Sequence, residues 1–169
     1  MKKIAILYGT LSGNTHAIAK YMEDLTGVDK VSLYDINDIQ ASVLDKYENI
    51  IMGIPTWSFG QLHKAWKIFK EEMKSVDLNH KKIALFGLGD QKNYDENFAD
   101  GLREVYDILI AKGANIIGEW PADDYHFTQS KALLDNGNFV GLVLDEDTQS
   151  LKTKERIEKW HNQIMNHFK

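Results

Sequence analysis

The sequence predicts an α/β protein built on a doubly wound, five-stranded parallel sheet with helices on both faces. Several short runs are almost wholly apolar, as in Ile4–Tyr8 and Lys82–Leu88, which is typical of strands that are buried on both faces. These runs alternate with segments whose apolar residues recur at helical spacing. No repeat or linker interrupts the alternation over 169 residues, so we expect a single domain spanning residues 1–169.

The candidate strands are Ile4–Tyr8, Val31–Tyr34, Asn49–Gly53, Lys82–Leu88 and Ala114–Ile117, with a further strand-like run at Phe139–Leu144. Because proline lacks the N–H that a ladder needs, Pro55 is expected to end the third strand. The stretch Trp120–Asn138 has no clear pattern and is expected to be a loop. A loop of this length is unusual in a compact domain, and we interpret it as an insertion that splits the fifth strand.

Four segments carry apolar residues on one helical stripe, with Gly113 at a C-terminal cap position after the third. Their apolar residues are Ala17, Ile18, Tyr21, Met22 and Leu25; Leu62, Ala65, Trp66, Phe69 and Met73; Phe98, Leu102, Val105, Tyr106 and Leu109; and Ile157, Trp160, Ile164 and Phe168. In open parallel sheets, ligands bind at the carboxyl ends of the strands, where the winding reverses. The loops after the first, third and fourth strands are therefore the candidate site.

Composition excludes several classes of protein. The absence of cysteine rules out a disulfide scaffold, a cysteine-ligated iron–sulfur cluster and a thiolate nucleophile, so a redox protein of this sequence needs an organic cofactor. The net charge of −5 argues against a general nucleic-acid binder. With neither a signal peptide nor a membrane span in the sequence, a cytoplasmic location is expected. The six histidines lack the spacing of a metal pair, so no metal site is expected.

The first loop, Thr10–Thr15 (TLSGNT), combines hydroxyl side chains, a glycine and a helix N-terminus, a combination that suits a phosphate. It lacks both the lysine-containing phosphate motif of nucleotide triphosphatases and the glycine pattern of dinucleotide sites. It also has no Lys or Arg, so amides, hydroxyls and the helix dipole would hold the anion. A terminal monophosphate fits this description, although a plain helix cap would use the same residue types.

The second loop, Pro55–Gly60 (PTWSFG), contains a tryptophan at the expected ligand end of the sheet. The flat indole of Trp57 can stack on a planar ring system; the alternative is that it folds back onto the following helix as core.

The third loop, Gly87–Tyr94 (GLGDQKNY), offers Tyr94 as a second aromatic face. Its paired glycines, Gly87 and Gly89, would let the backbone approach a ligand, and Asp90 or Asn97 can also serve as a helix cap. Together the three loops predict a phosphate at one end of a ligand and two aromatic faces at the other, which is the outline of FMN.

These loops, in this order, resemble those of the long-chain flavodoxins. The family pattern T-x-[ST]-G-x-T is matched by Thr10, Ser12, Gly13 and Thr15; P-T-W with a following glycine by Pro55, Thr56, Trp57 and Gly60; and G-x-G-D-x-x-x-Y by Gly87, Gly89, Asp90 and Tyr94. The segment 120–150 is similar to the insertion that marks the long-chain subgroup. Leu11 and Leu88 depart from the family, which more often has a polar residue at the first position and a threonine at the second.

The resemblance implies a flavodoxin-like sheet of strand order 2-1-3-4-5 and an FMN-containing, low-potential carrier of single electrons with no catalytic residue of its own. Trp57 and Tyr94 would sandwich the isoalloxazine, and a carbonyl near Ser58 would face its N5. Amides around Leu88–Asp90 would contact the pyrimidine edge, with Asn97 and Asp147 at the ribityl chain or ring edge. The implied FMN-binding residues are Thr10, Leu11, Ser12, Gly13, Asn14, Thr15, Thr56, Trp57, Ser58, Phe59, Gly60, Leu88, Gly89, Asp90, Tyr94, Asn97 and Asp147.

The acidity of the chain is concentrated between Glu119 and Ser150, where seven carboxylates stand against one lysine. It is either a solvated edge or a docking surface for a positively charged partner. The resemblance implies redox partners such as a flavodoxin/ferredoxin reductase and low-potential oxidoreductases, a monomeric state, and neither nucleic-acid nor membrane binding.

Two other functions occur on the same fold. An NAD(P)H-dependent flavin or quinone reductase of the same fold would need room for a nicotinamide over the flavin. Two stacking aromatic residues and an acidic rim leave little space for one. A phospho-acceptor signalling domain would need clustered acidic residues after the first and third strands. Tyr8-Gly9 and Gly53-Ile54 supply none.

Overall fold

The computed structural model describes residues 3–57 and 59–168, and for Trp57 the backbone alone. The described residues form a seven-stranded sheet whose central path has the order β2-β1-β3-β5-β6. Its main strands are β1 (Ile4–Tyr8), β2 (Val31–Asp35), β3 (Asn49–Trp57), β5 (Lys82–Leu88), β6 (Asn115–Ile117) and β9 (Leu142–Leu144). These strands pair in parallel, which confirms the predicted doubly wound sheet.

The fifth strand is divided in two, as expected from the insertion. β6 pairs with β5 at residues 82–84, and β9 continues the same edge by pairing with β5 at residues 86–88. The chain between them is not wholly loop, because its ends form the short antiparallel pair β7 (Trp120–Pro121) and β8 (Asn138–Phe139). The expectation of an unstructured Trp120–Asn138 was therefore wrong at its two ends. Below, residues 118–141 are called the insertion.

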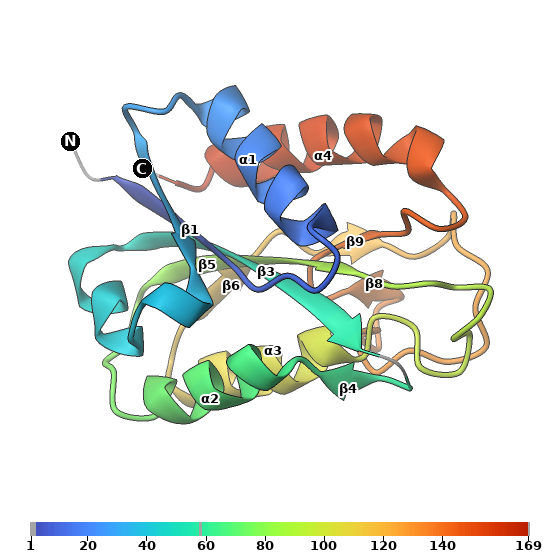
Figure 1. Cartoon of the computed structure of the whole chain (residues 1–169), viewed down its shortest axis with the longest axis horizontal. Helices are drawn as coiled ribbons and strands as arrows, with labels where there is room; N and C mark the ends of the chain where they lie inside the picture. Colours follow the sequence, from blue (N-terminus) through green and yellow to red (C-terminus); the bar gives the residue numbers. More distant parts are fainter. Residues whose placement is uncertain (1–2, 58, 169) are drawn as a thin grey trace.

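Helices cover both faces of the sheet (Figure 1). α1 (Asn14–Thr26) and α4 (Ser150–Met165) lie on one face, above the sheet in the view of Figure 1, and enclose a core that includes Trp160. α2 (Lys64–Met73) and α3 (Gly101–Ala111) lie on the other and enclose a core that includes Trp66. Two 3₁₀ helices, η1 (Ile36–Asp38) and η2 (Ala41–Lys46), connect β2 to β3 on the α2 side.

Two expected boundaries near the site were wrong. β3 does not stop before Pro55 but continues to Trp57. Its pairing with β1 ends at Gly53, so beyond that point β3 is an edge on one side, where a proline costs no ladder bond. Leu62 belongs to a short strand, β4 (Gln61–Leu62), that folds back on Thr56 and not to the following helix.

The third helix begins later than its apolar pattern indicated. Phe98 is buried but lies in a turn ahead of α3, which starts at Gly101. The turn contains Ala99 in the left-handed region, with φ 55°. The end of this helix was predicted correctly, since Gly113 has φ 80° and donates its N–H to the carbonyl of Ile110.

Within the described ranges, none of the helices is long and apolar enough to cross a membrane.

Candidate functional site

The loops that follow β1, β3 and β5 enclose a cavity of about 240 Å³ at the carboxyl ends of these strands. The turn between β9 and α4 closes its remaining side. The cavity is lined by Leu11, Ser12, Asn14, Thr15, Pro55, Thr56, Leu88, Gly89, Asp90, Tyr94, Glu146 and Asp147. The three predicted loops therefore meet where the winding of the sheet reverses, as open parallel sheets require of a ligand site.

The loop after β1 turns directly into α1. The Thr10 hydroxyl oxygen accepts a hydrogen bond from the N–H of Gly13 at 2.9 Å, which closes the turn. Gly13 has φ 89°, and a Cβ built there meets nothing within 4 Å, so backbone conformation and not crowding requires the glycine. The first N–H groups of α1 have no partner within the helix. Since Thr15 is buried and lines the cavity, these donors and its hydroxyl can serve one anion.

The loop after β5 is shaped by its own aspartate. The Asp90 carboxylate accepts hydrogen bonds from the backbone N–H groups of Lys92 (3.1 Å) and Asn93 (2.9 Å) and from the Asn93 amide (2.7 Å). It thereby folds the chain back so that Tyr94, 36% exposed as a residue, lies at the cavity wall. The carboxylate is therefore first of all a turn-forming group.

The paired glycines of this loop were expected to give a ligand access to the backbone; Gly89 lines the cavity, and that access stays a prediction. A Cβ at Gly87 would lie 2.7 Å from Leu102, and one at Gly89 would lie 2.9 Å from the ring of Phe98. Both glycines thus make room for protein side chains. The Gly89 N–H donates to the Leu144 carbonyl at 3.0 Å and is therefore already engaged within the protein.

The loop after β3 is described in part. The Trp57 side chain and all of Ser58 lie outside the described residues, so their expected contacts with a flavin stay predictions. Phe59 is 74% exposed, and its ring meets that of Tyr94 edge to face at 5.7 Å. Gly60 has φ 87° and packs against Asp100, with its built Cβ 2.8 Å from Oδ2 of that residue.

Asn97 was expected at the ribityl chain or ring edge, but it does not line this cavity. It lines a neighbouring space between the third loop and the insertion, together with Phe127 and Ser130. A tight turn carries the chain from Tyr94 into α3 and places Asn97 against Gly60. In this turn the Asn97 N–H donates to the Tyr94 carbonyl.

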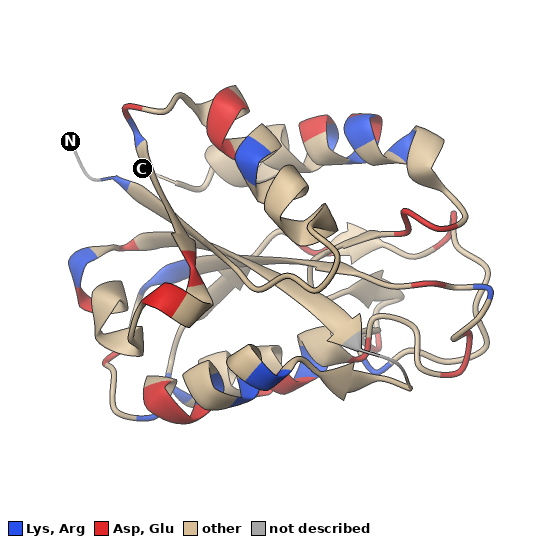
Figure 2. Cartoon of the chain, in the orientation of Figure 1, with Lys and Arg blue, Asp and Glu red and all other residues tan. Residues whose placement is uncertain are grey.

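The cavity is acidic. Asp90, Glu146 and Asp147 line it, and the described lining contains no lysine or arginine. Partial desolvation raises the pKa of Asp147 above its ordinary value, and the nearby charges of Asp90, Asp145 and Glu146 add to the effect. Figure 2 shows Asp and Glu in the loops at this end of the sheet, at the right of the view.

The sequence model of the family described as "Flavodoxin" matches residues 6–160. The chain belongs to the flavodoxin family. A flavodoxin from Buchnera aphidicola is 44% identical over 168 residues, covering 99% of this chain and 98% of the relative. Flavodoxin 1 of Escherichia coli K12 is 43% identical over 159 residues, covering 94% of this chain and 90% of the relative.

Solved flavodoxin structures agree over the whole chain. The crystal structure of Fusobacterium nucleatum flavodoxin bound to flavin mononucleotide has a TM-score of 0.93 and 33% identity, and it covers 100% of both chains. A K13G mutant of that flavodoxin, also bound to flavin mononucleotide, has a TM-score of 0.94 at 34% identity. The sheet order and the divided fifth strand are thus those of a flavodoxin.

The structure brings most of the sequence-predicted site residues to one cavity and leaves others outside it. At the cavity wall are Leu11, Ser12, Asn14, Thr15, Thr56, Leu88, Gly89, Asp90, Tyr94 and Asp147. Thr10, Gly13, Phe59 and Gly60 shape the loops without being part of the described lining. Sequence reasoning missed Pro55 and Glu146, although Glu146 lies beside the predicted Asp147 and Pro55 belongs to the matched P-T-W motif.

Proposed function

We propose that this chain is an FMN-containing, low-potential electron carrier that moves single electrons between redox enzymes, with residues 1–169 forming one FMN-binding domain. The observation that carries the proposal is the cavity, which has a helix N-terminus with hydroxyl groups at one end and an aromatic ring at the other. The family membership and the flavin-bound relatives support the same conclusion.

The Thr10–Thr15 loop would hold the phosphate of FMN. Thr15 and Ser12 offer hydroxyls at the cavity wall, and the first turn of α1 offers N–H groups together with the positive end of the helix dipole. Because this loop contains neither Lys nor Arg, binding relies on neutral donors. A monophosphate suits such a site better than a pyrophosphate, which would need a longer cradle.

The ring end of the cavity would hold the isoalloxazine, with Tyr94 and Trp57 proposed as the two stacking faces. FMN supplies the redox chemistry when bound; the chain orients it and sets its electrostatic surroundings. Each carboxylate at the wall disfavours the addition of negative charge to a desolvated ligand nearby. Asp90, Glu146 and Asp147 therefore make the second reduction unfavourable, which is the requirement for a low-potential donor.

The rim of the cavity would be the docking surface. Leu11 and Phe59 expose 45% and 74% of their surface beside it, and the acidic 119–150 segment adjoins it. A partner with a basic ring around an apolar contact fits this surface. The proposed partners are a flavodoxin/ferredoxin reductase and low-potential oxidoreductases. Charge complementarity would speed association with the partner, and the association would become weaker as the salt concentration rises. We propose that the chain acts as a cytoplasmic monomer.

An absorption spectrum followed by a reductive titration tests this function. The purified protein should be yellow, release FMN and not FAD on denaturation, and take up two electrons in one-electron steps at separate potentials. A colourless protein that does not bind added FMN, or a single concerted two-electron step, would contradict the proposal.

The alternative, an NAD(P)H-dependent flavin or quinone reductase, is not favoured by the family membership. It is distinguished by oxidation of NADPH with the purified protein alone. Steady turnover in the absence of a reductase would support the alternative.

A further inference from the structure

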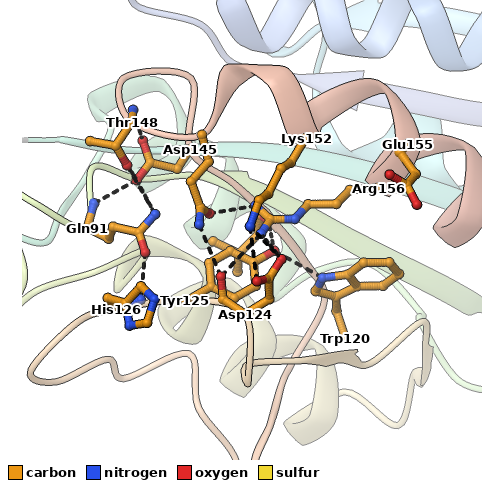
Figure 3. Close-up of polar contacts among 12 residues, drawn as sticks. Gln91, Trp120, Asp124, Tyr125, His126, Asp145, Thr148, Lys152, Glu155 and Arg156 are labelled. Carbon is orange, nitrogen blue, oxygen red and sulfur yellow. Dashed lines mark hydrogen bonds and ion pairs between the residues drawn. The ribbon is translucent and has the colours of Figure 1, made fainter.

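Gln91 follows Asp90 in the third loop, and its side chain points away from the cavity into the protein, 5% exposed. Its amide nitrogen donates to Oδ2 of Asp145 at 2.8 Å and to the Thr148 hydroxyl at 3.1 Å, and its amide oxygen accepts from the backbone N–H of His126 at 2.6 Å. One side chain therefore joins three segments that are far apart in sequence (Figure 3). These are the third loop, the turn after β9 and the insertion.

Asp145 is the centre of the second of these segments. Its carboxylate is fully buried and accepts hydrogen bonds from the backbone N–H groups of Gln91, Asp147 and Thr148 and from the Thr148 hydroxyl. Burial by itself raises the pKa of Asp145, but the hydrogen bonds from Thr148 and Gln91 outweigh it and hold the pKa below its ordinary value. The group is therefore an ionised acceptor at neutral pH, and it fixes the turn that carries Glu146 and Asp147.

The insertion presents the His126 N–H from a well-anchored position. The neighbouring Tyr125 is buried and donates its hydroxyl to the Val143 carbonyl in β9 at 2.5 Å. The Arg156 guanidinium of α4 lies 4.1 Å from the centre of the Tyr125 ring and pairs with Asp124 at 3.1 Å. Figure 3 shows Arg156 beside Asp124 and Tyr125.

The insertion also holds the far end of the third loop. Asp95 accepts hydrogen bonds from the backbone N–H groups of Thr128 and Gln129, both at 2.9 Å, through its carbonyl oxygen. Phe98 donates its N–H to the Gln129 carbonyl, and the Ser130 hydroxyl donates to the Phe98 carbonyl. The loop from Asp90 to Phe98 is thus bound to the insertion on both sides of Tyr94.

We infer that Gln91 is a positioning residue through which the insertion and Asp145 hold the two acidic walls of the cavity, Asp90–Tyr94 and Glu146–Asp147, at the spacing that the flavin ring requires. The inference rests on the proposed FMN function. It gives the insertion a role at the cofactor site, although no insertion residue lines the cavity. The phosphate end of the cavity, formed by the Thr10–Thr15 loop, makes none of these contacts.

The test is flavin binding by Gln91→Met, which keeps a similar volume and removes all three side-chain hydrogen bonds. Gln163→Met is the control, because it makes the same exchange at an exposed glutamine whose amide donates to the Glu119 carbonyl at 3.2 Å, away from the cavity. Fluorescence titration of the apoprotein should give FMN binding weakened by about tenfold or more in Gln91→Met, the loss expected when hydrogen bonds to a charged group disappear. Gln163→Met should bind like the wild type.

Riboflavin, which lacks the phosphate, separates positioning of the ring from a general loss of structure. Gln91→Met should weaken riboflavin and FMN by the same factor, since only the ring end of the cavity is disturbed. The separation between the two one-electron potentials should also change, because Asp90 and Asp147 shift relative to the ring. Two results together would overturn the inference: an unaltered separation between the two potentials, and a loss of flavin affinity no larger than the loss of folded apoprotein explains.

A charge-conserving exchange provides a rescue. Gln91→Glu places a second carboxylate against Asp145 and should weaken flavin binding more than Gln91→Met does. Adding Asp145→Asn restores one donor–acceptor pair between the two positions at unchanged total charge, and affinity should recover by about tenfold relative to Gln91→Glu. If the double variant binds no better than Gln91→Glu, the pair does not act as a unit and the inference fails. If the wild type itself binds no FMN, it is the proposed function that fails.

Discussion

Tyr125→Phe tests how the insertion is anchored, because it removes one oxygen and keeps the ring. The lost hydroxyl donates to the Val143 carbonyl at 2.5 Å and accepts from the indole N–H of Trp120 at 3.0 Å. The contact between the ring and the Arg156 guanidinium remains. We expect the variant to fold and to be measurably less stable.

The magnitude follows from burial. Val143 is fully buried, so its carbonyl loses a partner that water cannot replace, at about 1–3 kcal/mol. Trp120 is half-buried, and water can satisfy its N–H, so it adds little. The free energy of unfolding should therefore fall by about 2 kcal/mol, which for a domain of this size lowers Tm by about 4–8 °C.

The assay is urea and thermal denaturation of the apoprotein, with Tyr21→Phe as control. The Tyr21 hydroxyl donates to Glu158 at 2.5 Å near the surface, where water can replace the lost partner, so its loss should cost clearly less than that of the Tyr125 hydroxyl. Burial raises the pKa of Tyr125 far above its ordinary value, so the difference should be equal at about pH 6 and about pH 8. A loss below about 0.5 kcal/mol for Tyr125→Phe would refute the reasoning.

Three further predictions concern other parts of the molecule. Thr15→Val should weaken FMN binding by about tenfold and leave riboflavin binding unchanged, since the hydroxyl faces the phosphate end; equal losses for both ligands would contradict this. Burial lowers the pKa of His161, because the folded protein favours the neutral imidazole. The resulting contribution to the free energy of unfolding is complete above about pH 6.5, the pKa of an unfolded histidine, and is lost as the pH falls below it. His161→Gln should therefore flatten the fall in unfolding free energy between about pH 7 and about pH 5 in urea titrations, whereas an unaltered slope would argue against it. Gly141→Ala should lower the free energy of unfolding by more than about 3 kcal/mol, because its Cβ would lie 2.0 Å from the Leu85 carbonyl oxygen. Gly137→Ala is the control: it has open space around it, so in the same denaturation assay it should cost only about 1 kcal/mol of backbone strain.

The sequence by itself determined the layered fold and the place of the site. Apolar runs such as Ile4–Tyr8 and Lys82–Leu88 coincide with β1 and β5, because a strand covered on both faces has no polar side to interrupt the pattern. The loops that follow the first, third and fourth predicted strands could be located from the same contrast in polarity. Their polar and aromatic residues stand out against the apolar strands on either side.

Where the sequence failed, a long-range contact had overruled a local pattern. Pro55 did not end β3, since the strand is an edge there on one side. Phe98 follows the helical spacing of α3 but lies in a turn, held by hydrogen bonds to the insertion. Gly87 and Gly89 also accommodate Leu102 and Phe98, a packing role that no local pattern reveals.

What only the tertiary structure decided is how the site is held. From the sequence, Gln91 is a polar loop residue and Asp145 is one of seven acidic residues between Glu119 and Ser150. In the fold both are buried and hydrogen-bonded to each other, and Gln91 also accepts from the His126 N–H. The physical reason is that hydrogen bonds between segments depend on direction and distance, which a one-dimensional pattern of polarity does not contain. The sequence predicted most of the residues that line the cavity, and the fold alone showed the hydrogen bonds that join its walls.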